Sequence, residues 1–203
     1  MVDGLGADWT IPEPPQLDPA YVMAEVKRFP EPVFSQLMKQ TFEDATTAID
    51  WKELLGEERL AKHEARRKEF GSRWTLRTGI WHAGRLVAWT FGWNDAPGRY
   101  YQANSGVLPA HRRKGLYRAL MIRVLQRCQE QGFEEVWSKH IATNNPILVA
   151  KLRAGFLLTG TELSPSFGSL VTMSCPLIPE RREALLVRTG LKKPGPELSR
   201  YLS

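Results

Sequence analysis

Three basic residues, Arg112, Arg113 and Lys114, lie directly before Gly115 near the middle of the chain. The residues before them predict a strand that ends at Pro109, and the apolar residues after them recur at helical spacing. The N-terminus of a helix has free N–H groups and a partial positive charge, so it binds anions and above all phosphates. The pattern therefore predicts an anion site between a strand and a helix, with a plain solvated basic loop as the alternative.

The same stretch resembles the acyl-CoA pyrophosphate loop of the GNAT superfamily of N-acyltransferases. The family pattern is Arg/Gln-x-x-Gly-x-Gly/Ala, and its three marked positions fall on Arg112, Gly115 and Tyr117. Tyr117 departs from the small residue that usually ends the pattern. The spacing of the glycines does not fit a dinucleotide-binding fingerprint.

A second resemblance to the same family lies downstream. The Asn that opens a helix in the family falls on Asn144, and the helix ends before Gly155 and Phe156. Asn145 and Pro146 are predicted to be the N-cap and a first-turn proline. The two motifs come in the family's order, and the resemblance covers roughly residues 20–177.

The resemblance implies acetyl-CoA, or another acyl-CoA, as co-substrate, without a metal. Backbone N–H groups of the loop would hold the pyrophosphate, and in this chain they belong to Arg113, Lys114, Gly115, Leu116 and Tyr117. Arg112 would add charge at the start of the loop. The strand edge at Val107 and Leu108 would pair with the amides of the pantetheine arm. Asn144 would bind the same arm, or would only cap its helix.

The implied reaction is direct attack of a neutral primary amine on the thioester carbonyl. It requires loss of the amine proton, donors for the oxyanion and a proton for the leaving thiolate. The family often has a Tyr as the acid seven residues after the Asn, but this chain has Lys151 there. Lys151 is a candidate proton donor or thiolate stabiliser, although an exposed lysine or a phosphate contact is the favoured interpretation.

Two further residues are candidates for the chemistry, so the catalytic group stays unassigned. His140 lies near the end of a predicted strand and could act as acid or base, or be structural. Tyr101 or its neighbour Tyr100 faces the cleft, because successive strand residues alternate. Trp89, Phe91 and Trp93 share one strand face. We expect them to be core residues, with a wall for an aromatic or cationic acceptor as the alternative.

Periodicity and chain breakers predict a mixed α/β fold, with a GNAT-like central mixed sheet and flanking helices. The predicted strands are 21–29, 73–82, 86–93, 100–108, 133–141, 156–163 and 169–177. The predicted helices are 32–48, 51–70, 116–131 and 146–154. Residues 1–19 are expected to be an extended arm, 20–177 the acyltransferase domain, and 178–203 an extension with a short helix and a loose tail.

Composition bounds the remaining possibilities. The chain has 203 residues, 42% of them apolar, and a net charge of +6. It shows neither an apolar run of membrane-spanning length nor a secretory signal, so the cytoplasm is the expected compartment. Its two cysteines, Cys128 and Cys175, are expected in the core rather than in a disulfide or zinc site.

Two rival functions remain open beside the N-acetyltransferase. One is a non-catalytic acyl-CoA-binding module of the same fold, which Lys151 at the Tyr position would favour. The other is a basic nucleic-acid-binding protein, made less attractive because the basic residues are interleaved with acidic ones. The amine acceptor and the acyl chain length are not determined, and a homodimer is also open.

Overall fold

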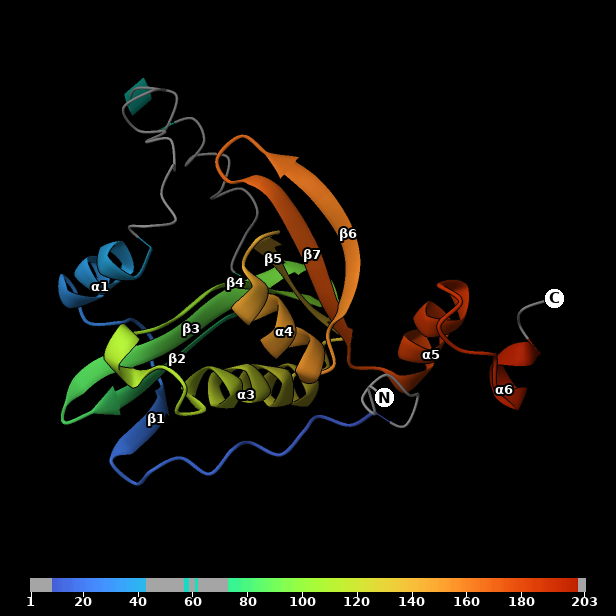
Figure 1. The fold of residues 1–203 in the computed structure, drawn as a ribbon, viewed down its shortest axis with the longest axis horizontal. Coiled ribbons are helices and arrows are strands. Elements are labelled where there is room, and N and C mark those ends of the chain that lie inside the picture. The colour runs from blue at the N-terminus through green and yellow to red at the C-terminus, as the bar shows by residue number, and fades with distance from the viewer. Residues whose placement is uncertain (1–8, 43–56, 59–60, 62–72, 201–203) are drawn as a thin grey trace.

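A seven-stranded mixed sheet with the strand order β1-β2-β3-β4-β5-β7-β6 forms the centre of the molecule (Figure 1). The computed structural model describes residues 9–42, 57–58, 61 and 73–200. The strands are β1 (Tyr21–Glu25), β2 (Thr75–His82), β3 (Arg85–Ala96), β4 (Arg99–Val107), β5 (Glu135–Ile141), β6 (Leu157–Ser164) and β7 (Gly168–Pro176). Each predicted strand is confirmed, with shifts of a few residues at its ends.

The helices confirm the mixed α/β prediction. They are α1 (Val33–Phe42), α3 (Leu116–Glu130), α4 (Asn145–Arg153), α5 (Pro179–Arg188), the four-residue α6 (Pro196–Ser199) and a 3-10 turn, η2 (Pro109–His111). Residues 57, 58 and 61 are helical. The rest of the predicted helix at 51–70 lies outside the described residues, as does the predicted continuation of α1 beyond Phe42.

The sheet divides between β4 and β5. These two strands run parallel and pair over three positions, from Arg99 opposite Glu135 to Tyr101 opposite Trp137. All the other neighbouring strands are antiparallel and pair over five or more positions. Beyond Tyr101 the facing edges of β4 and β5 are therefore not joined to each other, which leaves room between them.

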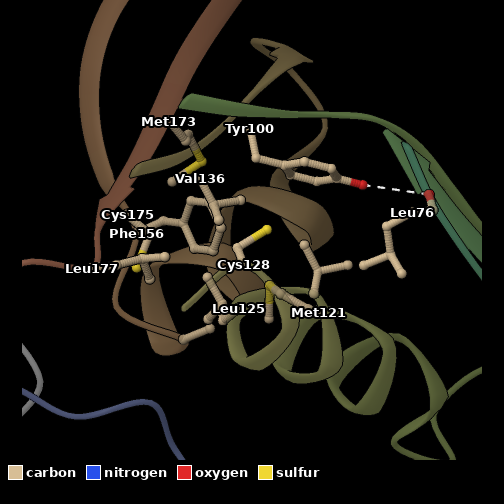
Figure 2. Packing of buried hydrophobic residues seen from close by; sticks show 12 residues of the cluster. Leu76, Tyr100, Met121, Leu125, Cys128, Val136, Phe156, Met173, Cys175 and Leu177 are labelled. Atoms are coloured by element: carbon tan, nitrogen blue, oxygen red, sulfur yellow. Dashed lines mark hydrogen bonds between the residues drawn. The ribbon is translucent and has the colours of Figure 1, made fainter. Parts of the chain in front are cut away.

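Helix α3 packs on one face of the sheet because its apolar residues follow helical spacing (Figure 1). The apolar residues that recur at helical spacing after Gly115 are Leu116, Leu120, Val124 and Cys128, and all four are buried. Figure 2 shows the larger core cluster on this side, where Cys128 lies with Met121 and Leu125 of α3 among side chains from the strands. Cys175 is also buried there, so both cysteines occupy the core as predicted.

The opposite face of the sheet carries α1. Phe34 of α1 contacts the rings of Phe29, Trp89 and Phe91, with ring centres 4.4, 5.6 and 6.2 Å away. Trp89 is completely buried, and its Nε1 donates a hydrogen bond to Asn104 Oδ1 at 2.9 Å. The core interpretation is therefore confirmed for Trp89, whereas Phe91 and Trp93 are only half-buried.

The N-terminal arm and the C-terminal extension meet beside α4. Trp9 of the arm and Arg182 of α5 are in contact, with the guanidinium carbon 4.5 Å from the ring centre. Arg182 is fully buried and donates a hydrogen bond to the carbonyl oxygen of Gly155 at 2.8 Å. A Cβ atom at Gly155 would lie 2.2 Å from Trp9 Nε1, so this glycine allows the close approach.

Candidate active site

A cleft of about 810 Å³ occupies the space where β4 and β5 diverge. It takes its lining from both faces of the sheet, including Met38 and Lys39 of α1, Tyr117 of α3 and Asn144 at the start of α4. The sheet residues in its wall are Tyr101, Gln102, Ala103, Asn104, Ser105, Lys139, His140, Ile141, Glu162, Ser164 and Leu170. Four of the candidate residues are thus brought together: Tyr101, Tyr117, His140 and Asn144.

The basic loop leads into α3 as predicted. Arg113 and Gly115 both have left-handed backbone conformations, with φ angles of 62° and 79°. Such a turn directs successive N–H groups toward one side, which is a geometry that binds anions. The N–H of Arg112 donates to the carbonyl oxygen of Pro109, and the N–H of Ala119 donates to that of Gly115. Among the described residues, no N–H between these two donates to a backbone carbonyl oxygen. The intervening N–H groups, from Arg113 to Arg118, include all five that are predicted to hold a pyrophosphate.

The basic side chains of this loop are held in different ways. Lys114 Nζ donates a hydrogen bond to the Tyr21 hydroxyl at 3.0 Å, and His111 Nδ1 lies 3.0 Å from the same oxygen. Arg112 Nε donates to the carbonyl oxygen of Val107 at 3.2 Å. Arg113 is exposed. The positive charge therefore surrounds the N-terminus of α3 from several sides.

The predicted strand edge needs one correction. The N–H of Leu108 donates to the carbonyl oxygen of Val87 on β3 at 3.0 Å, and its own carbonyl oxygen accepts from His111. Both backbone polar groups of Leu108 are thus already engaged inside the protein. Val107 remains the edge candidate through its N–H, because alternation along β4 directs its backbone groups away from β3, while its carbonyl oxygen already accepts from Arg112 Nε.

Asn144, rather than Asn145, is the N-cap of α4, so the predicted cap position was wrong by one residue. The helix begins at Asn145, and Pro146 lies in its first turn as predicted. Within the described residues, the Asn144 side chain makes no capping hydrogen bond, and it lies at the cleft. Asn144 therefore occupies the cap position of α4 while its side chain is not engaged in capping.

Lys151 is not the exposed lysine that we favoured. Its side chain is 1% exposed, and Nζ donates a hydrogen bond to Oε1 of Gln102, itself a cleft residue. Nζ also lies 3.8 Å from the centre of the Phe156 ring. Burial lowers the pKa of Lys151 to about 7. A lysine of this kind can change its charge near neutral pH.

His140 lies on β5 on the α4 side of the cleft. Its Nε2 is 2.9 Å from the hydroxyl oxygen of Ser138, which is fully buried. Burial, and secondarily the charge of Lys151, lowers the pKa of His140 to about 3. A neutral imidazole can accept a proton only weakly, so this environment does not favour His140 as a base at neutral pH.

We expect the His140 imidazole to stay neutral throughout the working pH range. In a proton NMR titration, its Cε1–H resonance should show no shift of the full size of imidazole protonation between pH 4.5 and 8, because the pKa lies near 3, and only a smaller step from the titration of Lys151. His140→Gln assigns the resonance. A full-size titration step centred near the ordinary value of about 6.5 would contradict this environment.

The α1 side of the cleft is aromatic. Tyr101 points there while Tyr100 is buried in the core, which confirms that just one of the pair faces the cleft. The Tyr101 ring lies 4.7 Å from the ring centre of Trp137 and 5.5 Å from that of Trp93. Burial raises the pKa of Tyr101, so its hydroxyl is neutral at physiological pH.

Sequence reasoning missed several cleft residues. Gln102 is buried and joins Lys151 to the hydroxyls of Thr90 and Ser105, to each of which its Nε2 donates at 3.0 Å. A polar residue two positions after Tyr100, on the same strand face, was the available signal. Others are Lys139 and Glu162, which form an ion pair at 2.7 Å, and Phe167 in the β6–β7 turn. Strand pairing brings these together, so no local pattern indicates them.

Comparisons with known proteins show the family and the fold. The model of the acetyltransferase (GNAT) family matches residues 34–156, which is more than half of the chain. No curated protein matches the sequence.

Solved structures share the fold at low sequence identity. Ard1 from Thermoplasma volcanium is 18% identical, with a TM-score of 0.57 over 78% of this chain and 98% of its own. The ribosomal-protein-S18-alanine N-acetyltransferase from Escherichia coli is 15% identical, with a TM-score of 0.52 over 77% and 94%. The yncA protein from Salmonella typhimurium, solved with its cofactor acetyl-CoA, is 20% identical, with a TM-score of 0.52 over 78% and 94%.

Two kinds of feature are absent from the described residues. None of the helices there is both long and apolar enough to cross a membrane. In the same part of the chain, no three His, Cys, Asp or Glu side chains gather in a way that could hold a metal ion.

Proposed function

Because this chain belongs to the GNAT acetyltransferase family, we propose that it transfers an acetyl group from acetyl-CoA directly to a primary amine. The observation that carries the proposal is the divergence of β4 and β5 into a cleft beside the basic loop that opens α3. The cytoplasm is the proposed compartment.

The proposed donor site uses residues from three elements. The free N–H groups from Arg113 to Tyr117 would bind the pyrophosphate at the start of α3, with the positive charge of Arg112 beside them. Asn144 lines the cleft, and Val107 ends β4, the strand that forms one wall of it. They would bind the amides of the pantetheine arm, in the manner of an added strand.

In the transfer step, the amine nitrogen attacks the thioester carbonyl carbon and the carbon–sulfur bond breaks. The amine loses a proton, and the coenzyme A thiolate gains one. Lys151 is buried next to the cleft, where it donates a hydrogen bond to the cleft residue Gln102. In its protonated form it would stabilise the negative charge that develops on the thioester oxygen and the leaving sulfur. Tyr101 and the Ser138–His140 pair are the other proton-bearing groups there.

The acceptor that we propose is a primary amine whose remaining atoms are largely apolar. The wall on the α1 side offers Met38, Tyr101 and Phe167, while the charges of Lys139 and Glu162 neutralise each other. An apolar or aromatic body gains more from such a wall than a highly charged one does.

The activity is tested by following thiol release from acetyl-CoA with a panel of primary amines. We expect arylalkylamines such as phenylethylamine to give faster release than ethanolamine or putrescine, whose bodies are small or charged. Phe167→Ala should reduce the difference, whereas Leu191→Ala, which removes another exposed apolar side chain outside the cleft, should not.

Two results would change this assignment. Acetyl-CoA binding without thiol release with any amine would favour the non-catalytic acyl-CoA-binding module. If all amines gave equal rates of thiol release, and Phe167→Ala had the same rates as wild type, the protein would still be an acetyltransferase but the proposed class of acceptor would be wrong.

A further inference from the structure

Gln102 is the buried polar residue that connects the wall of the cleft to Lys151. It lies on β4, is 4% exposed and lines the cleft. Its Oε1 accepts a hydrogen bond from Lys151 Nζ. Its Nε2 donates to the hydroxyl oxygens of Thr90 and Ser105, each at 3.0 Å. Both polar atoms of this buried amide are therefore hydrogen-bonded inside the protein.

An irregularity in β4 brings the two hydroxyl groups to the same amide. Gln102 and Ser105 would face opposite sides of a regular strand, because they are three positions apart. The register with β3 shifts between Phe91 and Gly92, where β4 contains one extra residue. A bulge of this kind changes the direction of the side chains beside it. Ser105 consequently contacts Gln102 and also donates to Thr90 Oγ1 at 2.8 Å.

The hydrogen bonds fix which way the amide of Gln102 points. The ammonium group of Lys151 has only donors, so the amide oxygen has to face it. The hydroxyl oxygens of Thr90 and Ser105 accept from the amide nitrogen on the other side. A half-turn of the amide would place its NH2 group against the ammonium group. The carbonyl oxygen is therefore held toward Lys151.

The other titratable groups around Lys151 do not compensate its charge. They are His140 of β5, Cys175 of β7 and Arg182 of α5, which is hydrogen-bonded to Cys175. Burial lowers the pKa of His140 to about 3 and raises the pKa of Cys175 to about 12, so both are neutral near pH 7. Arg182 is itself a cation. In the part of the chain that the structure describes, the carbonyl oxygen of Gln102 is the one hydrogen-bond acceptor of Lys151 Nζ.

We propose that Gln102 is a positioning residue for the acetyl transfer, which holds the ammonium group of Lys151 beside the cleft and keeps it charged. The inference rests on the proposed function, in which that charge stabilises the leaving sulfur. Burial by itself favours the neutral amine, whereas a hydrogen bond from the ammonium group to a carbonyl oxygen favours the charged form. The amide of Gln102 neither gives nor takes a proton in the reaction, so it acts through Lys151.

The test changes the group that faces Lys151 in two opposite ways. Gln102→Leu removes the carbonyl oxygen, and Gln102→Glu, which has nearly the same shape, replaces the amide with a carboxylate. The pKa of Lys151 is measured in the full-length protein from the carbon-13 shift of its Cε atom, which Lys151→Met assigns. From the wild-type value of about 7, we expect a decrease of about one unit in Gln102→Leu and an increase of at least about one unit in Gln102→Glu.

The pH profile of kcat is the second measurement. The kcat for thiol release with phenylethylamine should decline at high pH as Lys151 loses its proton. This decline should begin at lower pH in Gln102→Leu and at higher pH in Gln102→Glu, whereas a role in packing alone would not move the two variants in opposite directions. Gln126→Leu makes the same change at a half-buried position of α3 outside the cleft, and this control should keep the wild-type pKa of Lys151 and the wild-type profile.

Two outcomes would overturn the inference. One is a pKa of Lys151 that is unchanged, or that moves in the same direction, in both variants of Gln102. The other is a shifted pKa with an unchanged pH profile of kcat. If Gln102→Leu does not fold, the nearly isosteric Gln102→Glu still decides both points. Absence of thiol release from wild type with every amine would instead contradict the proposed function, and the titration of Lys151 would still decide whether Gln102 keeps it charged.

Discussion

Gly115→Asp removes at least about half of the stabilisation of the protein by acetyl-CoA. The substitution places a carboxylate in the loop proposed to bind the pyrophosphate, where like charges repel the cofactor. A ligand at 100 times its Kd stabilises the folded state by about 2.7 kcal/mol, or roughly 5–10 °C in Tm for a chain of this size. We expect this shift in wild type, and in the variant a loss of at least about tenfold in affinity, about 1.4 kcal/mol. Thermal unfolding with and without acetyl-CoA measures both.

The control for this experiment is Gly84→Asp in the β2–β3 turn. Gly84 has a φ of 74°, close to the 79° of Gly115, and a Cβ there would meet nothing within 4 Å. A Cβ at Gly115 would make contact with Pro15 at 3.4 Å, so neither position lacks space. Both variants therefore lose a similar amount of stability, on the order of 1 kcal/mol, but Gly84→Asp keeps the acetyl-CoA shift. A folded Gly115→Asp that also keeps it would show that the donor binds elsewhere.

Lys151→Met makes the protein more stable at neutral pH and removes part of its pH dependence. The folded pKa of Lys151 is lowered to about 7, whereas a lysine in the unfolded chain titrates near 10.4. Between these values the unfolded chain holds a proton that the folded protein lacks, so the free energy of unfolding rises with pH. Below about pH 7 both states are protonated, and the full cost of burying the charge remains.

The wild-type free energy of unfolding should therefore rise by about 1.5 kcal/mol more than that of Lys151→Met between pH 7 and 8.5. At pH 7 the variant should be more stable by roughly 2 kcal/mol, even though Gln102 loses a hydrogen-bond partner. Urea unfolding across this range measures both. Lys192→Met, which removes a partly exposed lysine paired with Glu183, is the control and should keep the wild-type slope. If the free energies of unfolding of wild type and Lys151→Met changed in parallel with pH, the pKa of Lys151 would not be lowered by folding.

The sequence predicted those parts of the site that depend on neighbouring residues. The turn at Arg113 and Gly115 and the helix after it follow from backbone preferences over a few positions. Alternation along β4 placed one of Tyr100 and Tyr101 in the core and the other at the cleft. The misplaced cap at Asn145 is an error of one residue, as expected where two Asn residues precede a proline.

The other features depend on pairing between distant segments. Nothing near Arg99 or Glu135 indicates that their strands pair over three positions and then diverge. The general tendency of lysines to be exposed gave the wrong answer for Lys151, because Gln102 of β4 and Phe156, just before β6, enclose it. The ion pair of Lys139 with Glu162 likewise arises from two strands far apart in the sequence.

The short ladder between β4 and β5 also divides the molecule dynamically. Three paired positions connect β1–β4 with β5–β7–β6, so the edge amides beyond Tyr101 and Trp137 are not protected by each other's strand. In hydrogen–deuterium exchange these amides should exchange well before those of the β2–β3 and β5–β7 ladders. A cofactor chain lying between the strands would supply the missing partners. Cofactor binding would then slow the exchange of the amides along the facing edges of β4 and β5. The two halves of the sheet would also open together, as one cooperative unit.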